Sequence, residues 1–271
     1  MREEATHVGR ILGDRPAPRS QGGATIISGT GLAGRREALR RDFVANVSHE
    51  LKNPAGALAL IAETMIGEED PEALRRLAER MLSEADRLNL MIDDLLDFSR
   101  VELEERPRRA HVSLQAVVFD AVERAAGNAH ARDVKLDIDQ VPADLVVNGS
   151  RRQLSSALGN LIENAVKYSP LHGTVSVRVV GKTTMVDIKV VDNGIGIAAA
   201  DMKRIFERFY RSEDAHAHGA GGAGLGLAIV RQVAADHDGE VLVSSRKGRG
   251  STFILRLPLS VPAGVATIET L

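Results

Sequence analysis

The chain has no cysteine, which excludes disulfide bonds and thiolate metal sites and is typical of cytosolic proteins. It also has no run approaching the ~18–20 apolar residues of a membrane-spanning helix, and its start, MREEATHVGR, does not form a signal peptide. The net charge of −2 gives no overall field that would attract nucleic acid or an anionic membrane. We therefore expect a cytoplasmic chain without a membrane span and without a nucleic-acid partner.

The 271 residues suffice for one large domain or two modest ones. Little periodicity is present in residues 1–34, which carry Pro16, Pro18 and several glycines and predict a flexible leader. We expect a helical region over 35–104, a second domain over 112–260 and a frayed tail over 261–271. Whether the leader follows a membrane or sensor region stays open.

The helical region carries a coiled-coil seam, because its apolar residues recur at intervals of four and three from Val47 to Met65. Residues 67–71 end one helix and begin another, which is expected to run to about Glu102. One hairpin cannot cover its own apolar stripe. Two hairpins should therefore pair as a homodimeric four-helix bundle.

The segment DFVANVSHELKNP, residues 42–54, places His49 on the first helix with Glu50 directly behind it. If Val47 and Leu51 face inward, His49 falls at the most outward heptad position. An exposed imidazole with a pKa near ~6.5 is largely neutral and nucleophilic at cell pH. Taken alone, a surface histidine without a function explains the same pattern.

The second domain is predicted to be α+β, with helices layered on a mixed sheet. Its expected helices cover 113–130, 150–168 and about 224–237. Its expected strands are 134–139, a short one near 145–147, a hairpin of 174–181 and 184–191, and the pair 240–246 and 251–258.

Two polar motifs in this domain suit a nucleotide. Asn160, Asn164 and Lys167 share one helix face, where two carboxamides and an ammonium suit a magnesium–phosphate group. Asp192 ends a buried strand, where a carboxylate needs a donor such as the amino group of adenine, and the glycines at 194 and 196 allow close approach. A polar helix face and an ordinary turn are the alternatives.

Two further motifs follow. Phe206 and Phe209 are predicted to lie on a short helix at 205–211, either as an anchor for a mobile loop or as ordinary core. The glycine-rich run 219–230 precedes a helix and suits phosphate. Its G-x-G-x-x-G pattern is not a dinucleotide fingerprint, because no strand precedes it. His216 and His218 are more simply solvated than metal-bound.

The order and spacing of these motifs resemble the sensor histidine kinases of two-component systems. The phosphate-regulation type is the most similar, since RDFVANVSHEL is a familiar string there, and the resemblance covers about residues 36–260. It implies a dimerisation and histidine-phosphotransfer hairpin followed by an ATP-binding sandwich of the gyrase-like kind. The implied cofactors are ATP and Mg²⁺, and the implied partner is the receiver domain of a response regulator.

The resemblance also implies residue roles. His49 matches the phospho-accepting histidine, and Glu50 matches the acid that takes its ring proton. On the helix 150–168, the matching residues are Asn160, Asn164 as the magnesium ligand, and Lys167 and Tyr168 near the phosphates. The remaining nucleotide-binding residues are Asp192, Gly194, Gly196, Phe206, Phe209, Gly222, Gly224, Gly226 and Thr252, the last supporting the adenine-binding aspartate through water.

The chain departs from the family pattern at Lys52, Asn53 and Ala55, where arginine, threonine and leucine are more usual. Asn53 can still position water, which suggests a second activity, phosphatase action on the partner. Related ATPases carry a glutamate at the position of Asn160, and a carboxamide cannot replace it as a general base. We therefore expect an autophosphorylating histidine kinase. The alternative is a nucleotide-gated scaffold or phosphatase without autokinase activity.

Overall fold

The structure is a computed structural model that describes residues 8–11, 47–48, 51–103, 109–217 and 222–260. The chain divides into two compact units. One comprises residues 14–95 together with 221–223 and contains the helical hairpin, and the other is an α/β unit of residues 1–13, 96–220 and 224–271. The predicted order, a helical hairpin followed by an α+β domain, is confirmed.

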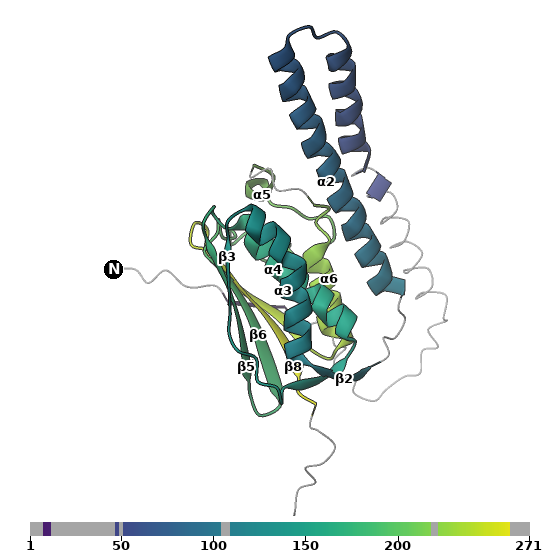
Figure 1. The fold of residues 1–271 in the computed structure, drawn as a ribbon. Helices are drawn as coiled ribbons and strands as arrows, with labels where there is room; N and C mark the ends of the chain where they lie inside the picture. Colours follow the sequence, from purple (N-terminus) through teal and green to yellow (C-terminus); the bar gives the residue numbers. More distant parts are fainter. Residues whose placement is uncertain (1–7, 12–46, 49–50, 104–108, 218–221, 261–271) are drawn as a thin grey trace, which may run out of the picture. The chain divides into compact units, whose positions relative to one another are not determined.

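The helical unit is a hairpin of a helix over residues 51–66 and the first part of α2 (Pro71–Leu103), joined by a short turn (Figure 1). Asp70 begins α2, because its side-chain oxygen accepts the backbone N–H of Glu72 and its carbonyl accepts that of Leu74. Pro71 occupies the first helical position, where its missing N–H costs nothing.

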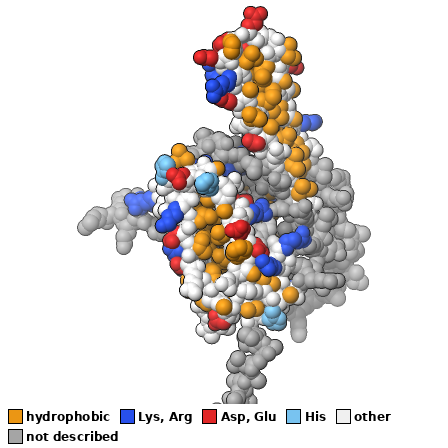
Figure 2. Space-filling view, in the orientation of Figure 1, with side chains coloured by type: hydrophobic (Ala, Val, Ile, Leu, Met, Phe, Trp, Pro, Cys, Tyr) orange, Lys and Arg blue, Asp and Glu red, His pale blue; other side chains and the backbone are white. Residues whose placement is uncertain are grey.

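Apolar side chains run along this hairpin (Figure 2). Most seam residues are only half-buried: Leu51, Leu58, Ile61, Met65, Leu74, Leu77, Met81 and Leu88. Pro54 and Met91 are buried. Outside the seam, Leu60 and Leu82 are 64% and 67% exposed. The hairpin by itself therefore leaves a long apolar surface in water.

The α/β unit is built on a six-stranded sheet with the strand order β1-β7-β8-β6-β5-β3. Its strands are β1 (Val8–Ile11), β3 (Lys135–Ile138), β5 (Thr174–Gly181), β6 (Met185–Asp192), β7 (Glu240–Ser245) and β8 (Ser251–Pro258). Only β3 and β5 are parallel, and the other neighbours are antiparallel. The predicted mixed sheet and the hairpin that turns after Gly181 are confirmed.

Three helices, α3 (Leu114–Ala131), α4 (Arg151–Tyr168) and α6 (Gly226–Asp236), cover one face of this sheet (Figure 1). The central helix α4 packs between α3 and α6 and contacts β5, β6 and β8. Side chains alternate between faces along a strand, and the helix-facing set is buried: Val175, Val177, Val186, Ile188, Val190, Val241, Val243, Phe253, Leu255 and Leu257. This layer is the core that positions the candidate site.

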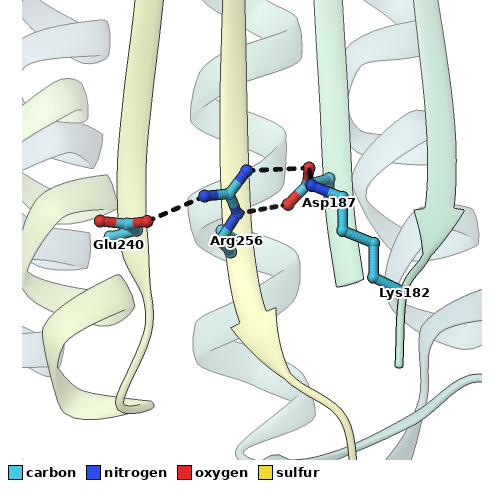
Figure 3. Close-up of polar contacts among 4 residues, drawn as sticks. All are labelled: Lys182, Asp187, Glu240 and Arg256. Atoms are coloured by element: carbon cyan, nitrogen blue, oxygen red, sulfur yellow. Dashed lines mark hydrogen bonds and ion pairs between the residues drawn. The ribbon is translucent and has the colours of Figure 1, made fainter. Parts of the chain in front are cut away.

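The other face of the sheet carries an ion-pair network (Figure 3). Arg256 on β8 donates from Nε and Nη2 to both oxygens of Asp187 on β6, at 2.6 and 3.0 Å, and from Nη1 to Glu240 on β7, at 3.1 Å. Lys182 lies 2.6 Å from Asp187. The hydrogen bonds from Arg256 and then Lys182 lower the pKa of Asp187 to about 2, so this buried carboxylate stays charged.

Three features differ from the expectations. Residues 8–11, expected within a flexible leader, form β1 at the edge of the sheet. The short strand near 145–147 is β4 (Val146–Gly149), and it pairs with an unpredicted strand, β2 (Ala110–Ser113), in a separate small sheet. Residues 205–211 form turns rather than a helix, because Phe206 is held in the core against Phe253 and Phe209 has a positive φ. The tail 261–271 lies outside the described residues.

His237 connects the end of α6 with the beginning of α4. Its Nε2 accepts the backbone N–H of Ser150 at 3.0 Å, and its Nδ1 lies 2.8 Å from the carbonyl oxygen of Val233. A neutral ring with its proton on Nδ1 satisfies both contacts. Ser150 in turn caps α4, because its hydroxyl accepts the backbone N–H of Gln153.

Acid is expected to weaken this junction. Burial is the largest influence on the pKa of His237 and lowers it, so the native state favours the neutral ring. Its contribution to stability is complete above the ordinary pKa of histidine, ~6.5, and is lost as the pH falls through the lower native value. Calorimetry from pH 7.5 to 5 should show a melting temperature that falls by about 2–4 °C more in the wild type than in His237→Gln. The exposed control His111→Gln should behave like the wild type, and equal acid sensitivity in His237→Gln would contradict this role.

Candidate nucleotide-binding site

Asp192 is the centre of the candidate site. It is the last residue of β6, lies on the helix-facing side of the sheet and is only 5% exposed. Its Oδ1 accepts the backbone N–H of Gly194 at 2.8 Å and that of Ser251 at 3.2 Å. Both bonds use the same oxygen. Within the described part of the chain, Oδ2 therefore has no hydrogen-bond partner and can accept a bond from a ligand.

Burial raises the pKa of Asp192, and the two backbone N–H groups oppose that shift. The predicted burial of an aspartate at a strand end is therefore confirmed. Hydrogen bonds from the protein offset only part of the free-energy cost of burying this carboxylate. A further donor aimed at Oδ2 would complete the set.

Glycines surround Asp192 because backbone segments pass too close for a Cβ. At Gly194 a Cβ would overlap the carbonyl oxygen of Tyr168, and at Gly196, with φ +66°, it would overlap that of Arg246. Gly250, which the sequence interpretation missed, has φ +86°, and a Cβ there would overlap the carbonyl of Asp192 itself. The loop after β6 is thereby pressed between the end of α4 and the β7–β8 turn.

Ser251, and not Thr252, lies beside Asp192. In the β6–β8 register Asp192 pairs with Ser251, whereas Thr252 pairs with Val191. Directly paired residues point to the same face, so a shift of one residue moves a side chain to the other face. The assignment of Thr252 as the support of Asp192 is therefore wrong by one position. Ser251 is 7% exposed, and its backbone N–H donates to the carboxylate.

The two asparagines on the polar face of α4 are buried to different extents. Asn160 is 5% exposed, donates from Nδ2 to its own helix at the Ser156 carbonyl, 2.9 Å away, and lies against Gly226, the first residue of α6. Asn164 is half-buried, and its carboxamide has no hydrogen-bond partner among the described residues. The two carboxamides therefore differ: Asn160 packs α4 against α6, and Asn164 presents a carbonyl oxygen that suits Mg²⁺.

Lys167 and Tyr168 continue this face to the end of α4. The ammonium of Lys167 lies 5.3 Å from the ring centre of Tyr168. The carbonyl of Tyr168 accepts the backbone N–H of Ile195 at 3.3 Å, which joins α4 to the glycine loop. Burial raises the pKa of Tyr168, so its hydroxyl stays protonated at neutral pH.

The two phenylalanines have different surroundings. Phe206 is fully buried, with its ring 6.5 Å from that of Phe253 in an edge-to-face arrangement, so it belongs to the core. Phe209 has φ +62°, and its backbone N–H donates to the carbonyl of Gly224 at 3.1 Å. Gly224 itself has φ +72° and lies too close to residues 209–210 for a side chain without adjustment.

The structure does not bring the remaining predicted residues together with the residues around Asp192. Gly222 has φ +118°, a conformation that glycine adopts readily. Asn53 is exposed on the helix 51–66, in the helical unit. His49 and Glu50 lie outside the described residues. The structure thus brings together Asp192, Gly194, Gly196, Tyr168 and the newly found Ser251 and Gly250 around one sheet end.

Comparisons with known proteins agree with this site. Residues 39–104 match the His Kinase A (phospho-acceptor) domain, and residues 149–261 match the histidine kinase-, DNA gyrase B- and HSP90-like ATPase family. The sensor-like histidine kinase SenX3 of Mycobacterium tuberculosis is 46% identical over 84% of this chain and 56% of its own length. The phosphate regulon sensor protein PhoR of Pseudomonas aeruginosa is 36% identical over 86% of this chain and 52% of its own length.

Solved structures show the same fold. The histidine kinase ThkA, solved in complex with the response regulator protein TrrA, matches 83% of this chain and 64% of that one with a TM-score of 0.64 at 21% identity. The Acinetobacter baumannii histidine kinase AdeS matches 79% of this chain and 98% of that one with a TM-score of 0.56 at 24% identity.

The chain belongs to the sensor histidine kinases of two-component systems, because it carries both the phospho-acceptor domain and the ATPase domain in the order found in these relatives. The ATPase family match implies ATP binding in the α/β unit. The chain spans about half the length of the curated relatives it matches. Among the described helices, none is long and apolar enough for a membrane span.

The glycine loop can be tested with a matched pair of alanine variants. Gly196 and Gly248 both have positive φ, but space for a Cβ is present only at Gly248. Gly248→Ala should cost about 1–2 kcal/mol of backbone strain and keep nucleotide binding. Gly196→Ala must also displace the β7–β8 turn, so we expect a larger loss of stability and at least about tenfold weaker binding of a fluorescent ATP analogue. Equal behaviour of the two variants would show that the close approach is unimportant.

Proposed function

We propose that this chain is an ATP-dependent protein-histidine kinase that phosphorylates itself at His49 and passes the phosphoryl group to an aspartate of a response-regulator receiver domain. The observation that carries the proposal is the buried Asp192 carboxylate, whose Oδ2 lacks a partner among the described residues beside a glycine-lined loop. Because ATP is the phosphoryl donor, the cytoplasm is the proposed compartment.

The α/β unit would hold the nucleotide through residues of different chemistry. Asp192 Oδ2 would accept the amino group of adenine, and Lys167 would neutralise phosphate charge. The half-buried carboxamide of Asn164 fits Mg²⁺, an ion that would neutralise charge on the phosphates when bound. Positioning and charge neutralisation supply most of the catalysis in phosphoryl transfer.

In the transfer itself, an imidazole nitrogen of His49 would attack the γ-phosphorus. The bond from that phosphorus to the β–γ bridging oxygen breaks, and ADP leaves with the electron pair. Glu50 would take the proton from the other ring nitrogen as the ring gains positive charge. The phosphohistidine then gives its phosphoryl group to a carboxylate oxygen of the receiver aspartate.

Asn53 would serve a different step. Residues four apart in a continuous helix share a face, so Asn53 would lie one turn beyond His49 and could reach a phosphoaspartate docked there. A neutral carboxamide orients water without the repulsion that a carboxylate would feel from a phosphoryl group. This step would make the chain a phosphatase of its own partner.

These roles predict three separable variants. His49→Gln should abolish labelling by radioactive ATP but leave nucleotide binding intact. Glu50→Ala should slow labelling by about 100–10,000-fold, the usual cost of losing a general base. Asn53→Ala should label at nearly the wild-type rate but slow dephosphorylation of the regulator. Phosphohistidine is acid-labile, so labelling is measured by mass spectrometry under alkaline conditions.

His111→Gln, an exposed histidine of the α/β unit, is the control and should label normally. Labelling of His49→Gln above a few per cent of wild type would reject His49 as the sole acceptor. A wild-type chain that binds ATP but never labels would favour the alternative, a nucleotide-gated scaffold or phosphatase. Equal loss of kinase and phosphatase activity in both other variants would mean that Glu50 and Asn53 only maintain the helix.

We also propose that two hairpins pair as a homodimer through residues 35–104. The half-buried seam and the exposed Leu60 and Leu82 support this, because exposed apolar surface of this extent favours association. Light scattering at micromolar concentration should give about twice the mass of the 29.1 kDa monomer. Leu58→Glu in the seam should shift the chain toward monomer, whereas Glu63→Gln on the exposed side should not. A wild-type monomer would contradict the proposal.

A further inference from the structure

Three polar residues form a row across the end of the sheet. Ser245 on β7 pairs with Ser251 on β8, which pairs with Asp192 on β6, so all three lie on the helix-facing side. We infer that Ser245 fixes the direction of the Ser251 hydroxyl and thereby makes this sheet end present only hydrogen-bond acceptors to a purine. The inference deepens the proposed function, on which it rests, by assigning a residue that determines base specificity.

The contacts of the Ser245 hydroxyl determine the proton positions. Its oxygen lies 2.9 Å from the backbone N–H of Ile197, 2.8 Å from the carbonyl oxygen of Gly250 and 2.9 Å from the Ser251 hydroxyl. A serine hydroxyl has one proton and two lone pairs. The N–H of Ile197 must donate and the carbonyl of Gly250 must accept, so the Ser245 proton goes to Gly250.

The Ser251 hydroxyl is then the donor in its bond with Ser245. This is the arrangement that satisfies every contact of Ser245, because the second lone pair of Ser245 can only accept. With its proton committed to Ser245, the Ser251 oxygen retains only lone pairs for any other neighbour. Asp192 Oδ2 is likewise an acceptor, so this row offers a ligand two acceptors and no side-chain donor.

Two acceptors discriminate between purines better than one. Adenine carries an amino group at position 6, which donates. Hypoxanthine and guanine carry a carbonyl oxygen there, which accepts, and a proton on the neighbouring ring nitrogen. That ring N–H could satisfy the Asp192 carboxylate alone, but the carbonyl oxygen would then face the lone pairs of Ser251. Rejection by unpaired or repelling polar groups is how polar sites gain specificity.

Ser245 also has a positioning role, because it holds the glycine loop through Ile197. A test must therefore separate base selectivity from general support of the loop. The ratio of the dissociation constants for ITP and ATP does so, since loss of support weakens both nucleotides whereas loss of hydroxyl direction changes their ratio. Titration calorimetry with the full chain and magnesium measures both constants without requiring kinase activity.

Three variants complete the design. Ser245→Ala frees the Ser251 hydroxyl to donate toward the base. The dissociation constant for ITP divided by that for ATP should therefore fall about tenfold. Ser245→Thr keeps the hydroxyl and should keep the ratio. Ser244→Ala is the matched control, because Ser244 is the neighbouring serine on β7 but pairs with Thr252 on the other face of the sheet. Its ratio should equal that of the wild type.

An unchanged ratio in Ser245→Ala, or equal weakening of both nucleotides, would overturn the inference while leaving the proposed function intact. A wild-type chain that binds neither nucleotide would instead contradict the proposed function. If Ser245→Ala does not fold, Ser251→Ala decides the question. Removing that acceptor should also lower the ratio, and an unchanged ratio in Ser251→Ala would reject the inference.

Discussion

The candidate site depends on one constraint, a carboxylate held in the interior at the end of β6. Asp192 is buried, and both hydrogen bonds that it receives come from backbone N–H groups at one of its oxygens. The backbone crowds around this carboxylate: a Cβ at Gly194 would overlap the Tyr168 carbonyl and approach Asp192 Oδ1, and one at Gly250 would overlap the Asp192 carbonyl. The path of the loop after β6 and the position of the β7–β8 turn both follow from the need to satisfy this one charge.

The alternation of side chains along the strands separates stability from recognition. On the helix-facing side, apolar residues fill the core until the last row, where Asp192, Ser251 and Ser245 replace them. On the opposite side, Asp187 and Arg256 pair across β6 and β8. A buried pair of this kind is costly to break from one side only, because the remaining charge would be left without a partner. The network therefore supports the register on which the polar row depends.

The sequence predicts the long elements well because their signals are local. Gly181 ends β5 where the hairpin turn is expected, α4 begins within one residue of its expected start at 150, and Asp192 ends β6 as its place after an apolar run predicts. The errors arise where distant segments decide. Phe206 and Phe209 have helical spacing, but contacts with Phe253 and Gly224 impose turns instead. Thr252 lies on the opposite face of β8 from Ser251, the residue beside Asp192, because strand parity is set by pairing with β6, which no local pattern records.

The carboxamide of Asn160 links fold and proposed chemistry. Its Nδ2 is bound to its own helix at Ser156, and its Oδ1 lies against Gly226, where α6 begins. A carboxylate at this position would be able to take a proton from water, whereas a carboxamide cannot. The neutral residue at position 160 packs α4 against α6. It also agrees with the proposed kinase, which must keep ATP intact until a histidine, rather than water, receives the phosphoryl group.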